Sequence, residues 1–231
     1  MKRLVISTGA GMSAESGIST FRDAGGLWEQ YPVMQVASAD GFRRDPALIH
    51  RFYNERRSQL VLAHPNDGHI GLVELEKHFT VNIITQNVDD LHERAGSTNV
   101  LHLHGELMKV RALDDETKIY SLSPDALDTS VDTTIEGHHV RPHIVFFQEA
   151  VPNIGPACDL VRQADIFVVI GTSLSVYPAA GLLGYVRPAT EVYYIDPNPV
   201  SVPEWVNVIR AGASEGIKHL TRILLNDEEK A

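Results

Sequence analysis

The sequence predicts an α/β protein that has a Rossmann-like, doubly wound parallel sheet and a small inserted lobe. Short unbroken apolar runs recur along the chain, segments with helical spacing separate them, and one polar, turn-rich stretch interrupts the alternation. Unbroken apolar runs are typical of strands that are buried on both faces of a parallel sheet. Strands that alternate with helices indicate the doubly wound arrangement.

The expected elements follow from these patterns in chain order. The expected strands are the apolar runs at residues 4–6, 81–84, 100–103, 144–147, 166–170, 192–195 and 206–209. The expected helices are the segments at residues 46–62, 68–78 and 215–225. The polar stretch at residues 106–139 is expected to form the inserted lobe, and residues 1–105 and 140–231 the Rossmann-like domain.

The composition excludes several classes of function. The chain has 231 residues, 43% of them hydrophobic, which is enough for a substantial core. Lys and Arg number 20 against 30 Asp and Glu, so the net charge of -10 repels phosphate backbones and argues against nucleic-acid binding. An acidic surface favours basic partners, lysine-rich protein segments among them. Cys158 is the single cysteine, so the chain by itself can form neither an intramolecular disulfide nor a thiolate zinc cluster.

The expected location is the cytoplasm. Met1-Lys2-Arg3 leads directly into a short apolar segment, and the longer apolar stretch and cleavage site of a signal peptide are missing. No apolar run approaches the length that spans a membrane, so no membrane partner is expected. The oligomeric state is left open.

The first segment with chemical potential follows the first expected strand. It reads Gly9-Ala10-Gly11-Met12-Ser13-Ala14-Glu15-Ser16-Gly17. Glycines let the backbone approach a pyrophosphate, and the N-terminus of a following helix offers free N–H groups to it. The position after a strand favours phosphate binding over a plain tight turn. The acidic ribose-binding residue of a dehydrogenase, about 20 residues further on, is not apparent, which argues against an ordinary dehydrogenase.

Two further polar segments follow expected strands. In Thr85-Gln86-Asn87-Val88-Asp89, capping of a helix by Asn87 or Asp89 is the better interpretation if the segment is taken alone. In Gly171-Thr172-Ser173-Leu174-Ser175, contact with a phosphate or ribose and a plain turn are equally favoured. Ligands of open α/β sheets bind outside the carboxyl ends of the strands, where both segments lie.

A pair of histidines precedes a glycine in His102-Leu103-His104-Gly105. The alternation of side chains along a strand places both histidines on one face. Histidine is suited to proton transfer near neutral pH, and such a pair can also ligate a metal. No third ligand lies at metal-site spacing nearby, and any one of the 11 histidines is by default structural.

Together these segments resemble the sirtuin family, and the resemblance extends from residue 3 to about residue 225. The matching motifs, in the family's order, are Gly9 to Gly17 with Ile18, Phe21 and Arg22; Thr85 to Asp89 with Leu91 and His92; Ala95-Gly96; His104-Gly105; Arg141-Pro142 with Ile144 and Val145; Phe147, Glu149 and Pro152; and Gly171-Thr172-Ser173. The resemblance implies an NAD-dependent protein-lysine deacylase, a transferase that acts on acylated-lysine proteins.

NAD is the co-substrate that the resemblance implies, with residues 1–105 and 140–231 as its domain. The glycine segment and the Phe21-Arg22 loop would hold its phosphates and cover the nicotinamide ribose, and Asp89 would bind the carboxamide. The full set of implied contacts is Gly9, Ala10, Gly11, Ala14, Glu15, Phe21, Arg22, Gln86, Asn87, Val88, Asp89, Gly171, Thr172, Ser173, Asn198 and Ala213.

The implied catalytic residues are His104 and Asn87. In the family's mechanism, the acyl-lysine carbonyl oxygen attacks the anomeric carbon of the nicotinamide ribose, nicotinamide leaves, and an alkylimidate forms. His104 then acts as general base on a ribose hydroxyl, and the acyl group ends on ADP-ribose. Asn87 would position the reacting groups, while His102 has no assigned role.

A pair on the expected helix at residues 46–62 refines the substrate. Tyr53 and Arg56 are three residues apart and so share one helix face. A half-buried tyrosine and a surface arginine would be the usual fate of such residues. Together with Ala24, however, the pair resembles the subclass that removes succinyl or malonyl groups, because Arg56 can bind a carboxylate bidentately. The implied substrate-binding residues are Tyr53, Arg56, Ala24, Val145 and Phe146.

The chain departs from the family at two places. Most sirtuins carry two Cys-x-x-Cys pairs after the catalytic His-Gly, whereas residues 106–139 contain no cysteine, so a zinc-free lobe is expected. A metal held by His138, His139 and nearby acids is the alternative, but adjacent histidines on an exposed turn are more often polar surface. Gln148 replaces a glycine of the family's peptide-binding segment and adds a side chain where the peptide backbone approaches.

Two other functions remain open. An ADP-ribosyltransferase or NAD glycohydrolase would use the same cofactor residues but would not need Tyr53 and Arg56. A non-catalytic NAD-responsive binding protein would fit the altered peptide segment and the missing cysteines, but not the presence of His104, Asn87 and Asp89.

Overall fold

The parallel sheet that the apolar runs predict is present. The structure is a computed structural model that describes residues 1–18 and 31–228. Its larger sheet has the order β10-β9-β8-β1-β2-β3, and all neighbouring strands are parallel. The strands are β1 (Arg3–Thr8), β2 (Thr80–Thr85), β3 (Val100–His102), β8 (Ile166–Ile170), β9 (Glu191–Ile195) and β10 (Asn207–Ile209). The α/β doubly wound class is therefore confirmed.

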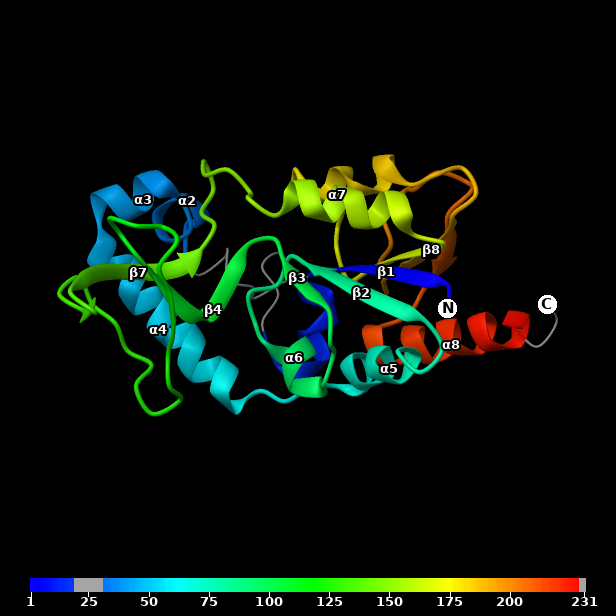
Figure 1. Ribbon diagram of the computed structural model, residues 1–231, viewed down its shortest axis with the longest axis horizontal. Helices are drawn as coiled ribbons and strands as arrows, with labels where there is room; N and C mark the ends of the chain where they lie inside the picture. Colours follow the sequence, from blue (N-terminus) through cyan, green and yellow to red (C-terminus); the bar gives the residue numbers. More distant parts are fainter. Residues whose placement is uncertain (19–30, 229–231) are drawn as a thin grey trace.

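Helices cover both faces of this sheet, which explains the unbroken apolar runs (Figure 1). On one face α5 (Asp67–Leu75) and α8 (Ala213–Glu228) pack against β1, β2 and β8 through a cluster that includes Leu72, Leu75 and Leu220. On the other face α7 (Ile154–Gln163) and the 3-10 helix η3 (Ala179–Tyr185) pack over Val5 and Phe167. Strands covered on both faces need apolar side chains at every position.

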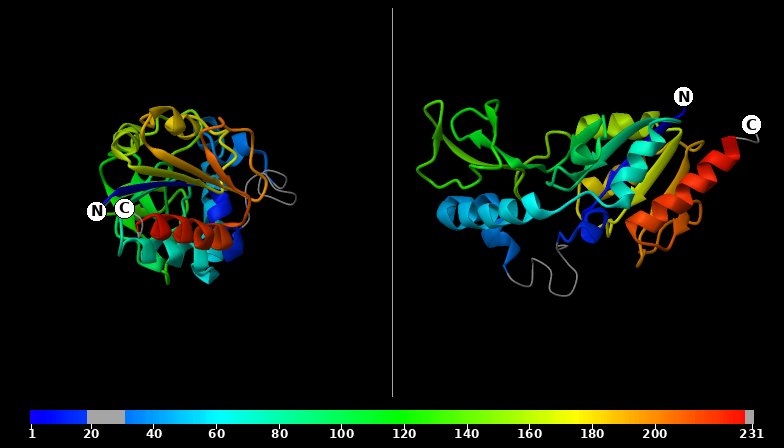
Figure 2. Two further views of the ribbon diagram at one scale, coloured as in Figure 1. Left: turned by 90° about the vertical axis from the view of Figure 1, so that its right-hand side faces the viewer. Right: turned by 90° about the horizontal axis from the view of Figure 1, so that it is seen from below.

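A separate lobe lies beyond the carboxyl ends of β1, β2 and β3 (Figures 1 and 2). It contains an antiparallel sheet of order β5-β4-β7-β6. Its strands are β4 (Gly105–Ala112), β5 (Ile119–Ser121), β6 (Thr134–Ile135) and β7 (His138–Ile144). The helices α2 (Val33–Val36), α3 (Ala39–Arg44) and α4 (Pro46–Leu62) lie beside this sheet, and α6 (Leu91–Ala95) lies between lobe and parallel sheet. The predicted division at residues 106 and 139 stays a prediction, while the antiparallel sheet itself spans Gly105 to Ile144.

One local expectation is wrong. The apolar run at residues 144–147 is not a strand of the parallel sheet. Only Ile144 lies in a strand, the antiparallel β7, and a turn follows in which the Glu149 amide donates to the Phe146 carbonyl at 3.0 Å. The glycine segment itself forms two single-turn 3-10 helices, η1 (Ala10–Met12) and η2 (Ala14–Ser16), and Gly17 ends the second with a φ of 81°.

Three side chains of α4 fasten the lobe. His50, Asn54 and Arg57 lie one helical turn apart in succession and all reach Thr129, in the loop between β5 and β6. The Asn54 amide donates to the Thr129 carbonyl at 2.9 Å, and the Thr129 amide donates to the Asn54 Oδ1 at 3.1 Å. This arrangement, which we call the Thr129 clasp, ties the loop to α4 through side-chain hydrogen bonds.

The clasp leads to a prediction about zinc. Because the loop is held by α4 and the lobe has no cysteine, we expect the purified, tag-free protein to contain no stoichiometric zinc by elemental analysis. His138, the alternative ligand, is bonded through Nδ1 to Asp114 at 2.8 Å and lies with Nε2 at 2.7 Å from the Lys118 Nζ. Within residues 1–18 and 31–228, no three His, Cys, Asp or Glu side chains are grouped as metal ligands. Zinc that survives dialysis at one equivalent would contradict the prediction.

Among the described helices, none combines the length and the apolar character that crossing a membrane requires.

Candidate active site

The predicted site residues from β1, β2 and β8 meet where the order of the parallel sheet reverses. The chain runs from β1 outward through β2 to β3, and it returns on the other side of β1 as β8. Open α/β sheets bind ligands at such a switch point. The Gly9 amide donates to the Ile170 carbonyl and the Gly11 amide to the Gly171 carbonyl, each at 2.9 Å. The glycine segment and the segment from Gly171 to Ser175 are therefore adjacent.

Glycine is required at position 171 by this close approach. Its φ is 61°, and a Cβ atom there would lie 2.5 Å from the Met12 amide nitrogen. Next to it, the Gln86 side chain donates from Nε2 to the Thr172 Oγ1 at 3.3 Å. The Thr172 hydroxyl also accepts from the Leu174 amide, so the plain-turn interpretation of this segment describes part of its role. Ser173 is exposed beside it.

Asn87 is fixed through most of its polar groups. Its side-chain Nδ2 donates to the Gly9 carbonyl at 3.0 Å and to the Ser13 hydroxyl at 3.1 Å, and its backbone amide donates to the Thr85 hydroxyl. Both hydrogens of Nδ2 are used, and among the described residues no donor reaches Oδ1. The Oδ1 atom is thus the part of the amide that is left for a ligand.

Asp89 lies beside Asn87, and its carboxylate accepts from the Ser13 hydroxyl at 2.9 Å. It also accepts from the Leu91 amide at 3.2 Å, at the start of α6, so the capping interpretation of this segment is partly correct. Burial raises the pKa of the Asp89 carboxyl group, although these two hydrogen bonds act in the opposite direction. Ser13 joins both side chains to the glycine segment, a role that the sequence reasoning missed.

His104 has the geometry of a general base. Its Nδ1 lies 3.1 Å from the Gln86 carbonyl oxygen, which can only accept, so Nδ1 carries the hydrogen and Nε2 keeps its lone pair. Burial lowers the pKa of His104 below its ordinary value of 6.5, partly offset by the bond to Gln86, and the ring is neutral at pH 7. Gly105 has a φ of 86°, and a Cβ atom there would lie 2.1 Å from the His143 carbonyl oxygen.

Tyr53 and Arg56 lie on the face of α4 that turns toward the lobe core. Tyr53 is buried, with its ring centroid 6.0 Å from that of Phe146. The Arg56 guanidinium lies 5.1 Å above the ring of Phe52, and its side chain is only 13% exposed. Its Nε and Nη1 have no hydrogen-bond partner within the described part of the chain, and Glu55 approaches Nη2 only to 3.8 Å.

The segment after β7 is held by a buried ion pair that the sequence reasoning did not identify. Arg141 donates to both carboxylate oxygens of Glu149, at 2.6 and 3.2 Å, and to the Ile144 carbonyl at 3.0 Å. Its guanidinium lies 3.9 Å above the ring of Phe146, and the Phe146 amide donates to Glu149 at 2.8 Å. Phe146 is therefore packed in the lobe core, while the half-buried Val145 donates to the His104 carbonyl.

The remaining predicted residues lie at the edge of the site or outside the described residues. Glu15 accepts from the Ser214 amide at 3.1 Å and so contacts the start of α8, beside the buried Ala213. Asn198 is exposed, and its amide donates to the Asp196 carboxylate. Gly9, Ala10, Gly11, Ala14 and Val88 belong to the segments described above. Phe21, Arg22 and Ala24 fall outside the described residues.

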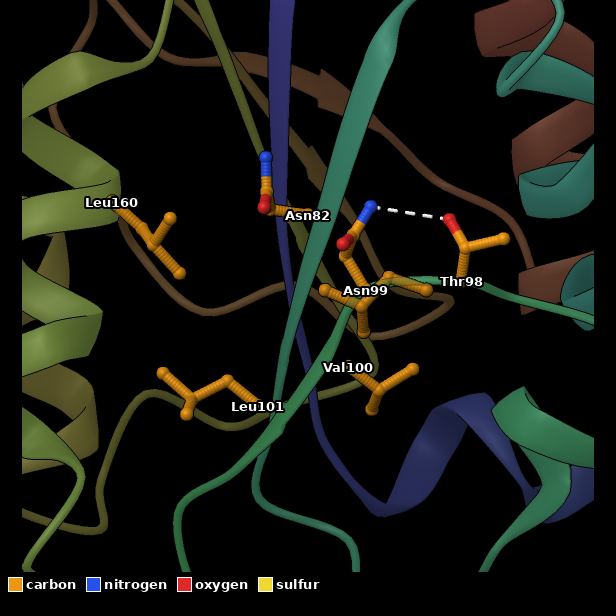
Figure 3. A pocket seen from close by; sticks show the side chains of 7 residues that line it. Asn82, Thr98, Asn99, Val100, Leu101 and Leu160 are labelled. Atoms are coloured by element: carbon orange, nitrogen blue, oxygen red, sulfur yellow. Dashed lines mark hydrogen bonds between the residues drawn. The ribbon is translucent and has the colours of Figure 1, made fainter.

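A hollow of about 290 Å³ elsewhere in the molecule is a poor candidate for an active site (Figure 3). It lies near the amino ends of β2 and β3, opposite the predicted segments. Its lining residues are Asn82, Ile83, Thr98, Asn99, Val100, Leu101 and Leu160, and none of them is titratable. Asn99 and Thr98 are bonded to each other at 3.1 Å. The hollow offers neither a base nor a charged group.

Comparison with known proteins identifies the family of the chain. The Sir2 family model matches residues 9–178. A protein of Bacteroides thetaiotaomicron named NAD-dependent protein deacylase is 57% identical over 231 residues, covering 97% of this chain and 99% of the relative. A Helicobacter pylori protein of the same name is 50% identical, with 95% and 96% covered.

Solved structures give the same result. An ADP-ribose complex of a Sir2 homologue superposes with a TM-score of 0.87 and 36% identity, covering 96% of this chain and 93% of that one. An NAD complex of a Sir2 homologue has a TM-score of 0.85 and 36% identity, with 98% and 90% covered. Because the family model and these relatives match most of the chain, and because the motif residues converge on one site, the protein belongs to the Sir2 family, the sirtuins.

Proposed function

We propose that this protein is an NAD-dependent protein-lysine deacylase that favours succinyl- or malonyl-lysine over acetyl-lysine. The deacylase activity and the use of NAD follow from its relatives, which carry that name over nearly the full length of the chain. The acyl preference goes further and rests on one observation, the buried and unpaired guanidinium nitrogens of Arg56. The substrates are acylated-lysine proteins, and the proposed location is the cytoplasm.

The described residues fit NAD by their chemistry. Amide, carboxyl and hydroxyl groups lie at the ends of β2 and β8, on Gln86, Asn87, Asp89 and Thr172. They match the carboxamide and the ribose hydroxyls of NAD, which need both donors and acceptors. When bound, NAD supplies the electrophilic anomeric carbon at which the acyl oxygen reacts. The glycine segment and Thr172 would hold the dinucleotide, with Glu15 and Ala213 at the edge.

The protein itself positions groups and moves a proton. Asn87, locked by Gly9, Ser13 and Thr85, would present Oδ1 to the ribose. His104, with its hydrogen held by Gln86, would accept a ribose hydroxyl proton at Nε2. The Val145 amide donates to the His104 carbonyl. The segment after β7, which would bind the substrate peptide, is thus bonded directly to the residue that acts as base.

Gln148 is compatible with a peptide at this segment. Its φ is 75°, a conformation that favours glycine, and its side chain is turned to α3. Gln148 Nε2 donates to the Asp40 carboxylate at 2.7 Å, and the Asp40 amide donates to Gln148 Oε1 at 3.1 Å. The added side chain is thus fastened against α3 by two hydrogen bonds.

The acyl preference is supported by the surroundings of Arg56. A guanidinium that is nearly buried and has two nitrogens without a hydrogen-bond partner carries a desolvation cost that a bound carboxylate would offset. Phe52 stacks on the guanidinium, which keeps its plane fixed for a bidentate contact. Tyr53, one turn earlier, would donate a neutral hydrogen bond to the same carboxylate.

Replacing Arg56 with methionine is expected to remove the preference selectively. A charge-assisted hydrogen bond is worth about 1.5–3 kcal/mol, which corresponds to roughly 10- to 100-fold in kcat/KM for succinyl-lysine. Acetyl-lysine turnover should persist, because an acetyl group has no carboxylate. The measurement is product formation by mass spectrometry with matched acetyl-, malonyl- and succinyl-lysine peptides and NAD.

Two controls make this test specific. Arg51→Met changes an exposed arginine of the same helix and should leave all three activities unchanged. Tyr53→Phe should cause a smaller loss than Arg56→Met, because it removes one neutral donor and no charge. Equal loss of acetyl and succinyl turnover in Arg56→Met would assign Arg56 to the fold. A wild type that prefers acetyl-lysine would contradict the acidic-acyl preference.

A further inference from the structure

His102 lies two residues before the proposed base, His104, and the proposed function assigns it no role. It is 9% exposed and sits between two acceptors. Its Nδ1 is 3.1 Å from the backbone carbonyl oxygen of Asn87, and its Nε2 is 2.8 Å from the Glu93 carboxylate. A carbonyl and a carboxylate can only accept hydrogen bonds, so both ring nitrogens must carry hydrogens. The geometry therefore requires a charged imidazolium.

The surroundings favour this charged form. Burial lowers the pKa of His102, but the hydrogen bond and charge of Glu93, the charge of Glu106 and the bond to Asn87 outweigh burial and raise it above 6.5. The titratable groups that interact with this pair from neighbouring elements are Glu106 and Lys109 of β4, Asp89 before α6 and His92 in α6.

His102 and His104 hold successive carbonyls of the same segment. His104 binds the Gln86 carbonyl and His102 the Asn87 carbonyl, so the two rings together fix the backbone that carries Gln86, Asn87 and Asp89. The His102 carbonyl is itself fixed by the Asn153 side chain at 2.8 Å. Those three side chains are the groups that the proposed function assigns to the nicotinamide ribose and carboxamide.

We propose that His102, kept charged by Glu93, is a positioning residue that fixes the Asn87 carbonyl and thereby orients the segment from Gln86 to Asp89 toward NAD. The inference rests on the proposed function. A neutral His102 has one N–H group only, which the carboxylate of Glu93 would retain, and the bond to the Asn87 carbonyl would be lost. The contact between His102 and the Asn87 carbonyl is therefore made only while His102 is protonated.

The two histidines consequently have opposite protonation requirements. His104 must be neutral to act as base, so activity falls as the pH drops through its lowered pKa, below 6.5. The raised pKa of His102 has the opposite effect. Its stabilising contribution is fully present below pH 6.5 and is lost as the pH rises through the higher pKa of the folded protein. A bell-shaped profile of kcat/KM for NAD follows, and its basic limb reports His102.

Two variants test the basic limb. Glu93→Gln keeps an acceptor for Nε2 but removes the charge, so the basic limb should move to lower pH while the acid limb stays in place. His102→Asn does not titrate and lacks the charged ring that joins Glu93 to the Asn87 carbonyl, so the basic limb should vanish and kcat/KM for NAD at pH 7 should fall by between about 10- and 100-fold. His78→Gln, an exposed histidine, is the control and should reproduce the wild-type profile.

A second measurement separates this inference from the proposed function. An NMR titration of the His102 ring needs no turnover and should give a pKa above 6.5 in wild type and a lower one in Glu93→Gln. Calorimetry with ADP-ribose should show weaker binding to His102→Asn at pH 7 than to wild type. A His102 pKa at or below 6.5, or a basic limb that both variants leave unchanged, would overturn the inference. If the wild type shows no deacylation while these NMR and binding results hold, the proposed function alone is contradicted.

Discussion

His104→Ala is expected to lower kcat for deacylation by about 10²–10⁴-fold while NAD binding persists, since that range is typical for the loss of a general base. The expectation rests on the tautomer that the Gln86 carbonyl imposes. With the hydrogen on Nδ1, Nε2 is the basic atom, and its pKa is lowered so that the neutral form predominates at pH 7. Single-turnover rates and calorimetric NAD binding are the two measurements.

A matched variant separates proton transfer from positioning. His104→Asn keeps a donor that can reach the Gln86 carbonyl but has no basic nitrogen, so it should lose as much activity as His104→Ala. Recovery of turnover in His104→Asn would mean that the ring acts by holding Gln86. Wild-type turnover in His104→Ala would assign the base to another group.

Arg57→Met is expected to lower the free energy of unfolding by roughly 2–4 kcal/mol. The Arg57 side chain is fully buried, and its Nε donates to the Leu107 carbonyl at 2.9 Å while Nη1 donates to Asn54 at 2.7 Å and to the Leu127 carbonyl at 3.2 Å. Methionine fills similar volume but leaves two carbonyls without donors, each at a cost of about 1–2 kcal/mol. The measurement is urea unfolding followed by circular dichroism.

The effect of this change should be local to the lobe. Burial lowers the pKa of Arg57 to about 10, partly offset by Asp128, so the side chain is charged at pH 7. Arg51→Met, an exposed arginine on the same helix, should change the unfolding free energy by less than about 0.5 kcal/mol. Hydrogen exchange should rise first at Thr129 and Leu107 in Arg57→Met. Equal stabilities of Arg57→Met and Arg51→Met would show that the Thr129 clasp contributes nothing.

The sequence by itself determined the parallel sheet, and it predicts the edge of the sheet at which a ligand would bind. Unbroken apolar runs such as Ile166–Ile170 and Val81–Ile84 have one physical solution, burial on both faces, and helical spacing between them supplies the covering layers. Polar residues after each run then lie at one edge, because parallel strands end on the same side. That reasoning predicts that Asn87, Asp89 and Thr172 lie at one edge, whereas the role of His104 is implied by the resemblance to the sirtuins.

What the sequence could not determine depends on contacts between residues far apart in the chain. The glycine segment forms single 3-10 turns where Gly9 and Gly11 bond to the carbonyls of Ile170 and Gly171 at the end of β8. Arg57 reaches a hydroxyl 72 residues away, and nothing in the spacing of α4 distinguishes it from its exposed neighbours. Side-chain hydrogen bonds of this kind leave no periodic trace in a sequence, since each is a single pair formed only after the layers have packed. The charge of His102 and the lack of partners for Nε and Nη1 of Arg56 were decided at that stage, by which acceptors the tertiary structure brought near.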